Sequence, residues 1–327
     1  MEKENNTTTT STNNIVFNDP VLNDEKKLYI FDEAEYDKLF QEKPWAKEDA
    51  YYKKVMISTL AVTKIVNHAV KAGDKEIAGY MIGFPKDRTF YVTDAVEFPL
   101  IGTTSRVEIA DQLGDKIHEY SADLLDTLKK VGNTQNYVGW YHSHPGFGCW
   151  LSGIDVNTHR TLQMLNKTFF ALVVDPFRTL STRKVEVGCF MTYNQDSGSN
   201  RSNFTENIPL NKSQEFGYHA NKYYKLEHQF FKSKFESDVI KLLYKNYWTE
   251  TLSSNVVELN NEYMKSLIED MSIKIGGFDL KKRHQFQGNQ EQLEIHQRKL
   301  DEVVSINTQN SVNIQNEIIK SLIFDEN

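Results

Sequence analysis

The sequence predicts an α/β fold in which a mixed β-sheet lies between layers of helices. Between residues 55 and 193, segments with apolar residues at helical spacing alternate with short segments rich in β-branched and aromatic residues. Phe169 to Val174 is almost entirely apolar, which is typical of a strand buried on both faces. We therefore expect an α/β sandwich, with the functional site at the edge of its sheet.

The N-terminal part predicts a tail, a long helix and a strand hairpin. Residues 1–25 include an Asn- and Thr-rich segment that we expect to be disordered. Val55 to Ala72 has helical spacing of its apolar residues, and Gly73 is a typical helix end. Two strands, Glu76 to Phe84 and Thr89 to Phe98, should form a hairpin because a turn sequence with proline separates them.

One α/β domain is expected at residues 26–215, with flexible insertions near 98–110 and 194–217. Its remaining elements should be helices from Asp111 to Val131 and Gly153 to Leu165, and strands from Asn136 to Tyr141 and Val185 to Tyr193.

The C-terminal region, residues 218–327, has helical periodicity and few core-forming residues. Because polar helices need a packing partner to stay folded, we expect these helices to bundle with other subunits and to serve complex assembly. They should run from Tyr223 to Trp248, Asn260 to Ile275, Gln290 to Ile306 and Ser311 to Phe324.

Composition excludes several classes of partner. The net charge of −7 disfavours nucleic acid or an anionic membrane, since either would select a basic surface. No apolar run reaches the roughly 18 residues of a transmembrane helix. The two cysteines, Cys149 and Cys189, do not form a disulfide scaffold, so we expect a reducing compartment. The localisation that we expect is the cytoplasm and nucleus.

The strongest functional signal runs from His142 to Asp155. His142 and His144 end a strand and share one of its faces, because strand side chains alternate. A glycine-rich loop follows, Ser152 opens a helix, and Asp155 lies in the first turn of that helix. Two imidazoles and one carboxylate can hold a catalytic zinc ion and leave a fourth position for water.

The same residues also permit structural interpretations. Ser152 to Asp155 fits a helix capping box, and a single strand histidine is usually a core residue. His159 shares a helix face with Asp155 and is a rival ligand. Cys149, inside the loop, is interpreted as a small buried hydrophobe.

The motif His-Ser-His-Pro, followed after five residues by Leu-Ser-Gly-Ile-Asp, resembles the zinc motif of the JAMM (MPN+) metalloproteases. These isopeptidases remove ubiquitin or ubiquitin-like proteins from lysines. The family pattern also has an upstream glutamate before small and apolar residues, which Glu76 matches. The resemblance implies an MPN-type three-layer core and one Zn²⁺ bound by His142, His144 and Asp155. It also implies Glu76 as general acid/base and Ser152 as an oxyanion-stabilising hydroxyl.

Other stretches resemble one branch of this family that acts inside a multi-subunit complex. They are Gly139 to Asp155, Ile208 to Lys212, Tyr223 to Glu227 and Asn246 to Ser254. The likeness implies removal of Nedd8 from the cullins of cullin-RING ubiquitin ligases, with the C-terminal helices joining the other subunits of that complex. The alternatives are a deubiquitinase of the proteasome-lid type and a non-catalytic MPN scaffold, which would lack the zinc ligands. A zinc nucleobase deaminase would need a Pro-Cys-x-x-Cys pair that this sequence does not contain.

One loop departs from the branch. In close relatives, the loop matching Gly102 to Val107 carries an acidic residue thought to help hold the isolated subunit inactive. Here that loop reads Thr103, Thr104, Ser105 and Arg106, with the arginine kept. A threonine cannot offer zinc a carboxylate, so we expect weaker or different autoinhibition.

Overall fold

The computed structural model describes residues 31–98, 114–182, 184–193, 208–253 and 261–276, together with Tyr29 and scattered residues between 297 and 318. Seven strands form one mixed sheet in the order β1-β3-β2-β4-β5-β6-β7, and β1 also pairs with β7, so the sheet closes. The predicted α/β class is confirmed. The strands are β1 (Lys54–Ser58), β2 (Ala78–Lys86), β3 (Thr89–Glu97), β4 (Asn136–Ser143), β5 (Phe170–Val174), β6 (Val187–Thr192) and β7 (Tyr223–Phe231).

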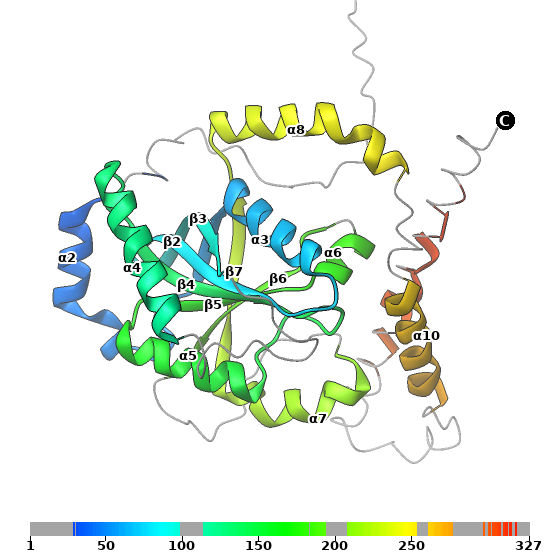
Figure 1. Ribbon diagram of the computed structural model, residues 1–327. Helices are drawn as coiled ribbons and strands as arrows, with labels where there is room; N and C mark the ends of the chain where they lie inside the picture. Colours follow the sequence, from blue (N-terminus) through cyan, green and yellow to red (C-terminus); the bar gives the residue numbers. More distant parts are fainter. Residues whose placement is uncertain are drawn as a thin grey trace, which may run out of the picture.

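Helices α3 (Thr59–Ala72) and α5 (Gly153–Leu165) cover opposite faces of the sheet (Figure 1). On the α3 face, Val62 and Ile65 pack into a buried cluster with residues from all seven strands. On the α5 face, Val156 packs with Trp140 and Phe190. This gives the three layers expected from the sequence, because each face of the sheet is apolar and needs a cover.

Six further helices are described: α2 (Glu33–Glu42), α4 (Gly114–Lys130), α6 (Pro176–Thr182), α7 (Leu210–His219), α8 (Lys234–Ser253) and α10 (Asn261–Gly276). Among the described helices, none combines the length and the hydropathy needed to cross a bilayer.

The first predicted helix begins later than expected. Residues Lys54–Ser58 form β1, and α3 starts only at Thr59. The hydroxyl of Ser58 accepts a hydrogen bond from Ala61 N at 3.1 Å, which caps the helix. The three consecutive apolar residues before Ser58 fit a buried strand as well as a helix, so periodicity could not separate the two.

The helix predicted from Tyr223 to Trp248 is wrong in its first part. Residues Tyr223–Phe231 form β7, which pairs in parallel with β1 and antiparallel with β6, and α8 begins at Lys234. Leu226 and Phe230 lie four residues apart, which fits a helix, but pairing on both sides satisfies the backbone of this segment better. The sheet therefore extends past residue 215, where the sequence placed the end of the domain.

Several expected segments lie outside the described residues. These are the tail at 1–25, the insertion from residue 99 onward, and residues 194–207 of the second insertion. The rest of the second insertion was expected to be flexible, but Leu210–His219 form helix α7. Of the two last predicted helices, only scattered helical residues are described.

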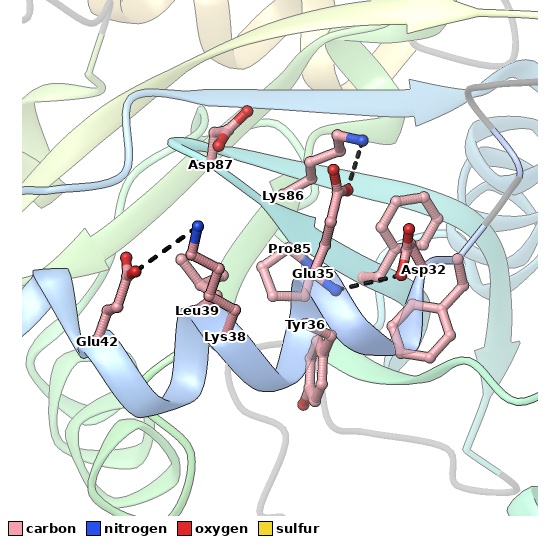
Figure 2. A pocket seen from close by; sticks show the side chains of 11 residues that line it. Asp32, Glu35, Tyr36, Lys38, Leu39, Glu42, Pro85, Lys86 and Asp87 are labelled. Carbon is pink, nitrogen blue, oxygen red and sulfur yellow. Dashed lines mark hydrogen bonds and ion pairs between the residues drawn. The ribbon is translucent and has the colours of Figure 1, made fainter.

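Helix α2 packs against the β2–β3 hairpin, and Figure 2 shows the residues that line the pocket between them. The carboxylate of Asp32 accepts from the N–H groups of Ala34 and Glu35 and so caps the helix. Lys86 pairs with Glu35 at 2.6 Å, but both side chains are exposed, so the pair contributes at most about 1 kcal/mol.

A single buried carboxylate joins the starts of α3 and α8. Glu236 accepts from the Ser58 hydroxyl at 2.7 Å, from Leu60 N at 3.3 Å and from Ser233 N at 2.7 Å. The Tyr29 hydroxyl also donates to it. Because both helices present their N-termini to this anion, their dipoles favour its charge.

Candidate metal centre

Three side-chain atoms meet at the end of β4. Nε2 of His142 lies 3.2 Å from Nε2 of His144. Oδ2 of Asp155 lies 3.4 Å from the first nitrogen and 3.5 Å from the second. Tetrahedral zinc with bonds of about 2.0–2.2 Å separates its ligand atoms by about 3.3–3.6 Å, so the three atoms fit a zinc-sized ion without rearrangement.

The centre lies at the end of a central strand. β4 pairs with β2 on one side and with β5 on the other, so the expectation of a site at the sheet edge is wrong. His144 N donates to Val174 O at 2.8 Å, which extends the pairing just past the strand end. Ser143 points to the opposite face, where its hydroxyl accepts from Ile77 N at 3.0 Å, so it has a structural part.

The capping box at the start of α5 orients the carboxylate ligand. Ser152 Oγ accepts from Asp155 N at 3.3 Å, and Asp155 Oδ2 accepts from Ser152 N at 2.8 Å. This Oδ2 is also the atom that faces both imidazoles. The capping interpretation and the ligand interpretation therefore both hold. Because Ser152 Oγ accepts within the cap, its hydroxyl proton remains available to a substrate.

His144 is oriented through its second nitrogen. Nδ1 lies 3.0 Å from Gly148 O, so it carries the proton and leaves the lone pair of Nε2 for a metal. Gly148 has a φ of +89°, and a Cβ there would lie 2.9 Å from the Arg178 guanidinium. The positive φ would strain any other residue at this position.

The sequence reasoning missed Asp175, which holds this glycine loop. Its fully buried carboxylate accepts from Gly146 N at 3.0 Å and from Gly148 N at 2.9 Å. Arg178 Nε lies 3.4 Å from the same carboxylate. An Asp-Pro pair directly after a buried strand does indicate a helix start, but nothing in the sequence connects it with the loop.

Burial alone would raise the pKa of Asp155, yet the two adjacent imidazoles hold it well below its usual value. For His142, burial lowers the pKa, but Asp155 and Glu76 outweigh this effect and raise it. The carboxylate is thus anionic, and a cation is needed to balance it. A metal ion would take the place of the proton that His142 otherwise binds more readily beside this carboxylate.

Glu76 is buried and lies close enough to influence the pKa of His142. It lies two residues before the start of β2, since the strand starts at Ala78 rather than at Glu76 as expected. Ala78 pairs with His142, and Ser143 N donates to Ile77 O at 3.0 Å. Continuing this antiparallel register places Glu76 beside His144 on the neighbouring segment.

The other candidate residues are not part of the ligand group. Nδ1 of His159 accepts from the Trp140 indole, and His159 is not one of the residues whose ligand atoms meet. Cys149 and Cys189 are buried, and burial raises the pKa of the Cys189 thiol. The loop of Thr103, Thr104, Ser105 and Arg106 lies outside the described residues.

Comparison with known proteins identifies a family. Residues 50–168 match the family model described as "JAB1/Mov34/MPN/PAD-1 ubiquitin protease". The chain is 41% identical over 266 residues to COP9 signalosome complex subunit 5 of Gibberella zeae, covering 80% of this chain and 76% of that protein.

Two further relatives agree. Subunit 5a of Arabidopsis thaliana is 41% identical, with 80% of this chain and 73% of the relative covered. Subunit 5 of Dictyostelium discoideum is 38% identical, with 77% and 75% covered. The chain therefore belongs to the COP9 signalosome subunit 5 family of JAB/MPN-domain proteins.

Proposed function

We propose that this chain is a zinc-dependent isopeptidase that removes Nedd8 from the cullin subunits of cullin-RING ubiquitin ligases, as the catalytic subunit of a COP9 signalosome. The observation that carries the proposal is the group of His142, His144 and Asp155, whose ligand atoms lie 3.2–3.5 Å apart beside the buried Glu76. The names of the relatives support the complex and, through it, the substrate class.

His142, His144 and Asp155 would hold the zinc ion, one per chain. Bound there, zinc supplies Lewis acidity, which lowers the pKa of water toward neutrality and polarises a substrate carbonyl. The chain supplies the proton transfers. Glu76 accepts a proton from the attacking water and delivers it to the departing lysine amine. Its buried position beside His142 suits a carboxylate with that task.

Ser152 is assigned to the oxyanion. Its half-buried hydroxyl lies at the start of α5, and its oxygen is held by the N–H of Asp155. A donor fixed in this way can stabilise the negative charge that develops on the carbonyl oxygen, an effect of about 3–4 kcal/mol for a single donor.

The C-terminal helices are assigned to assembly with the other signalosome subunits. Tyr263, Met264 and Leu267 of α10 pack on Ile306, while other apolar side chains of these helical segments are exposed. Apolar side chains on helical surfaces of this kind are typical of a protein interface. The exposed residues are Ile268, Ile273, Ile275, Leu300, Val304, Val312, Ile314 and Ile318. Neither nucleic acid nor a membrane is included among the partners, and we place the protein in the cytoplasm and nucleus.

The rival function is a deubiquitinase of the proteasome-lid type, which would use the same centre. The test compares cleavage of Nedd8-modified cullin with cleavage of lysine-linked diubiquitin by the purified complex, with a Glu76→Gln complex as the inactive control. We expect the cullin conjugate to be cleaved at least about a hundredfold faster, as measured by kcat/KM. Faster cleavage of diubiquitin would contradict the proposal and favour the rival.

A further inference from the structure

The two histidines of the metal centre are oriented by different means. His144 is fixed by the carbonyl of Gly148, as metal-binding histidines usually are through their second nitrogen. Nδ1 of His142 is buried and has no hydrogen-bond partner among the described residues. Some other contact must therefore fix the direction of its Nε2.

That contact is the indole ring of Trp140, two residues earlier on the same face of β4. The rings of Trp140 and His142 are stacked, with centroids 4.6 Å apart and planes inclined by 15°. A stacked indole prevents the imidazole from tilting. The orientation of the Trp140 ring thus determines where the lone pair of His142 points.

The Trp140 ring is itself held by His159. The indole Nε1 donates to Nδ1 of His159 at 3.3 Å, and both side chains are buried. Because Nδ1 accepts, the proton of the neutral imidazole lies on Nε2. Burial lowers the pKa of His159 to about 3, so the ring remains neutral and keeps this acceptor at ordinary pH.

The register of α5 against β4 explains why these contacts occur together. His159 follows Asp155 by four residues, which is about 6.0 Å along a helix. Trp140 precedes His142 by two residues, which is about 6.7 Å along a strand. The spacing along α5 is therefore nearly equal to the spacing along β4. Asp155 and His159 lie on one face of α5, so that Asp155 reaches the ligand group and His159 reaches the indole.

We propose that His159 is a positioning residue of the metal centre: it accepts the Trp140 indole N–H and thereby fixes the ring on which His142 stacks. The inference rests on the metal site of the proposed function. It replaces the interpretation of His159 as a rival ligand, since its Nδ1 accepts from Trp140 and His159 is not in the ligand group.

The test uses four single variants and one double variant of the full chain. His159→Leu removes the acceptor, whereas His159→Gln offers an amide oxygen in its place. Trp140→Phe keeps an aromatic ring for the stack but removes the donor. His228→Leu is the matched control, because His228 is a half-buried histidine on β7 outside the ligand group.

Two readouts are independent of turnover: the dissociation constant for Zn²⁺, from competition with a chelator, and the visible absorption spectrum of the Co²⁺-substituted chain. We expect His159→Leu and Trp140→Phe each to weaken Zn²⁺ binding by roughly tenfold, the lower end of the usual effect of such supporting contacts, and to alter the Co²⁺ spectrum. His159→Gln should stay within about threefold of wild type, and His228→Leu should be unchanged.

The double variant Trp140→Phe with His159→Leu should bind Zn²⁺ no more weakly than either single variant, because both break the same hydrogen bond. If His159→Leu does not fold, Trp140→Phe still tests the hydrogen bond, because it removes the donor. Wild-type affinity and an unchanged spectrum in both variants would overturn the role of His159. A wild-type chain that binds neither Zn²⁺ nor Co²⁺ would instead overturn the metal centre of the proposed function.

Discussion

Replacing Asp175 with alanine should weaken both the fold and the metal centre. The change removes the acceptor of three backbone N–H groups, those of Gly146 at 3.0 Å, Gly148 at 2.9 Å and Arg178 at 3.0 Å. It also leaves the Arg178 guanidinium without its carboxylate at 3.4 Å. The glycine loop would then lose the group that fixes its path.

The magnitude follows from burial. The N–H of Gly148 is buried and loses its full bond, whereas water can reach the partly buried N–H groups of Gly146 and Arg178. At about 1–3 kcal/mol for a buried unsatisfied group, the free energy of unfolding should fall by roughly 3–5 kcal/mol. Breaking a buried ion pair usually has an effect of the same size.

Asp175→Ala should affect metal binding through Gly148. Its carbonyl orients His144 at 3.0 Å, so a displaced loop should misalign that ligand. Loss of such a supporting contact typically weakens metal affinity by about 10–100-fold. The assays are urea unfolding of the metal-free chain in chelator and Zn²⁺ competition under native conditions.

The matched control is Glu236→Ala. Glu236 is likewise buried and accepts from two backbone N–H groups, those of Leu60 and Ser233, but its described hydrogen-bond partners lie outside the ligand group. We expect a comparable loss of stability with an unchanged Zn²⁺ dissociation constant. The reasoning would be refuted if the Zn²⁺ dissociation constant changed equally in both variants. It would also be refuted if Asp175→Ala lowered the free energy of unfolding by less than about 1 kcal/mol.

Three other predictions concern catalysis, pH and regulation. Glu76→Gln should retain one Zn²⁺ per chain by elemental analysis yet lose at least about a hundredfold in kcat, since the base contributes 10²–10⁴-fold; loss of the metal would contradict its assignment as a base. In chelator, the free energy of unfolding should decrease as the pH is lowered from 6.5 toward 3. The reason is that burial lowers the pKa of His159 to about 3, so only the unfolded chain takes up that proton in this window. The slope should be smaller in His159→Gln by up to about 1.4 kcal/mol per pH unit, and equal slopes would contradict the assignment. Thr104→Glu should make the isolated subunit less active. Equal activity of the wild-type and variant subunits would contradict the expectation of weaker autoinhibition here.

The ligand group could be predicted because its geometry is local. Alternation along a strand brings His142 and His144 to one face, and a capping box fixes Asp155 one turn into a helix. Asp175 could not be predicted in the same way. It meets Gly148 across 27 residues, through the parallel pairing of β4 and β5, which the sequence does not reveal.

Two errors have similar causes. Residues Tyr223–Phe231 carry apolar residues at a spacing that fits a helix, and only pairing with β1 and β6 makes them a strand. The sequence predicts the correct face for His159 but not the partner of its nitrogen. Spacing shows which side chains share a face, whereas the choice between Trp140 and the metal depends on packing between α5 and β4.

The most direct test of the central claim is an anomalous-difference map at the zinc absorption edge from crystals of the full chain grown with Zn²⁺. We predict one peak within about 2.0–2.2 Å of His142 Nε2, His144 Nε2 and Asp155 Oδ2. A peak bound elsewhere, or crystals with zinc in the solution and no peak at these three atoms, would contradict the account.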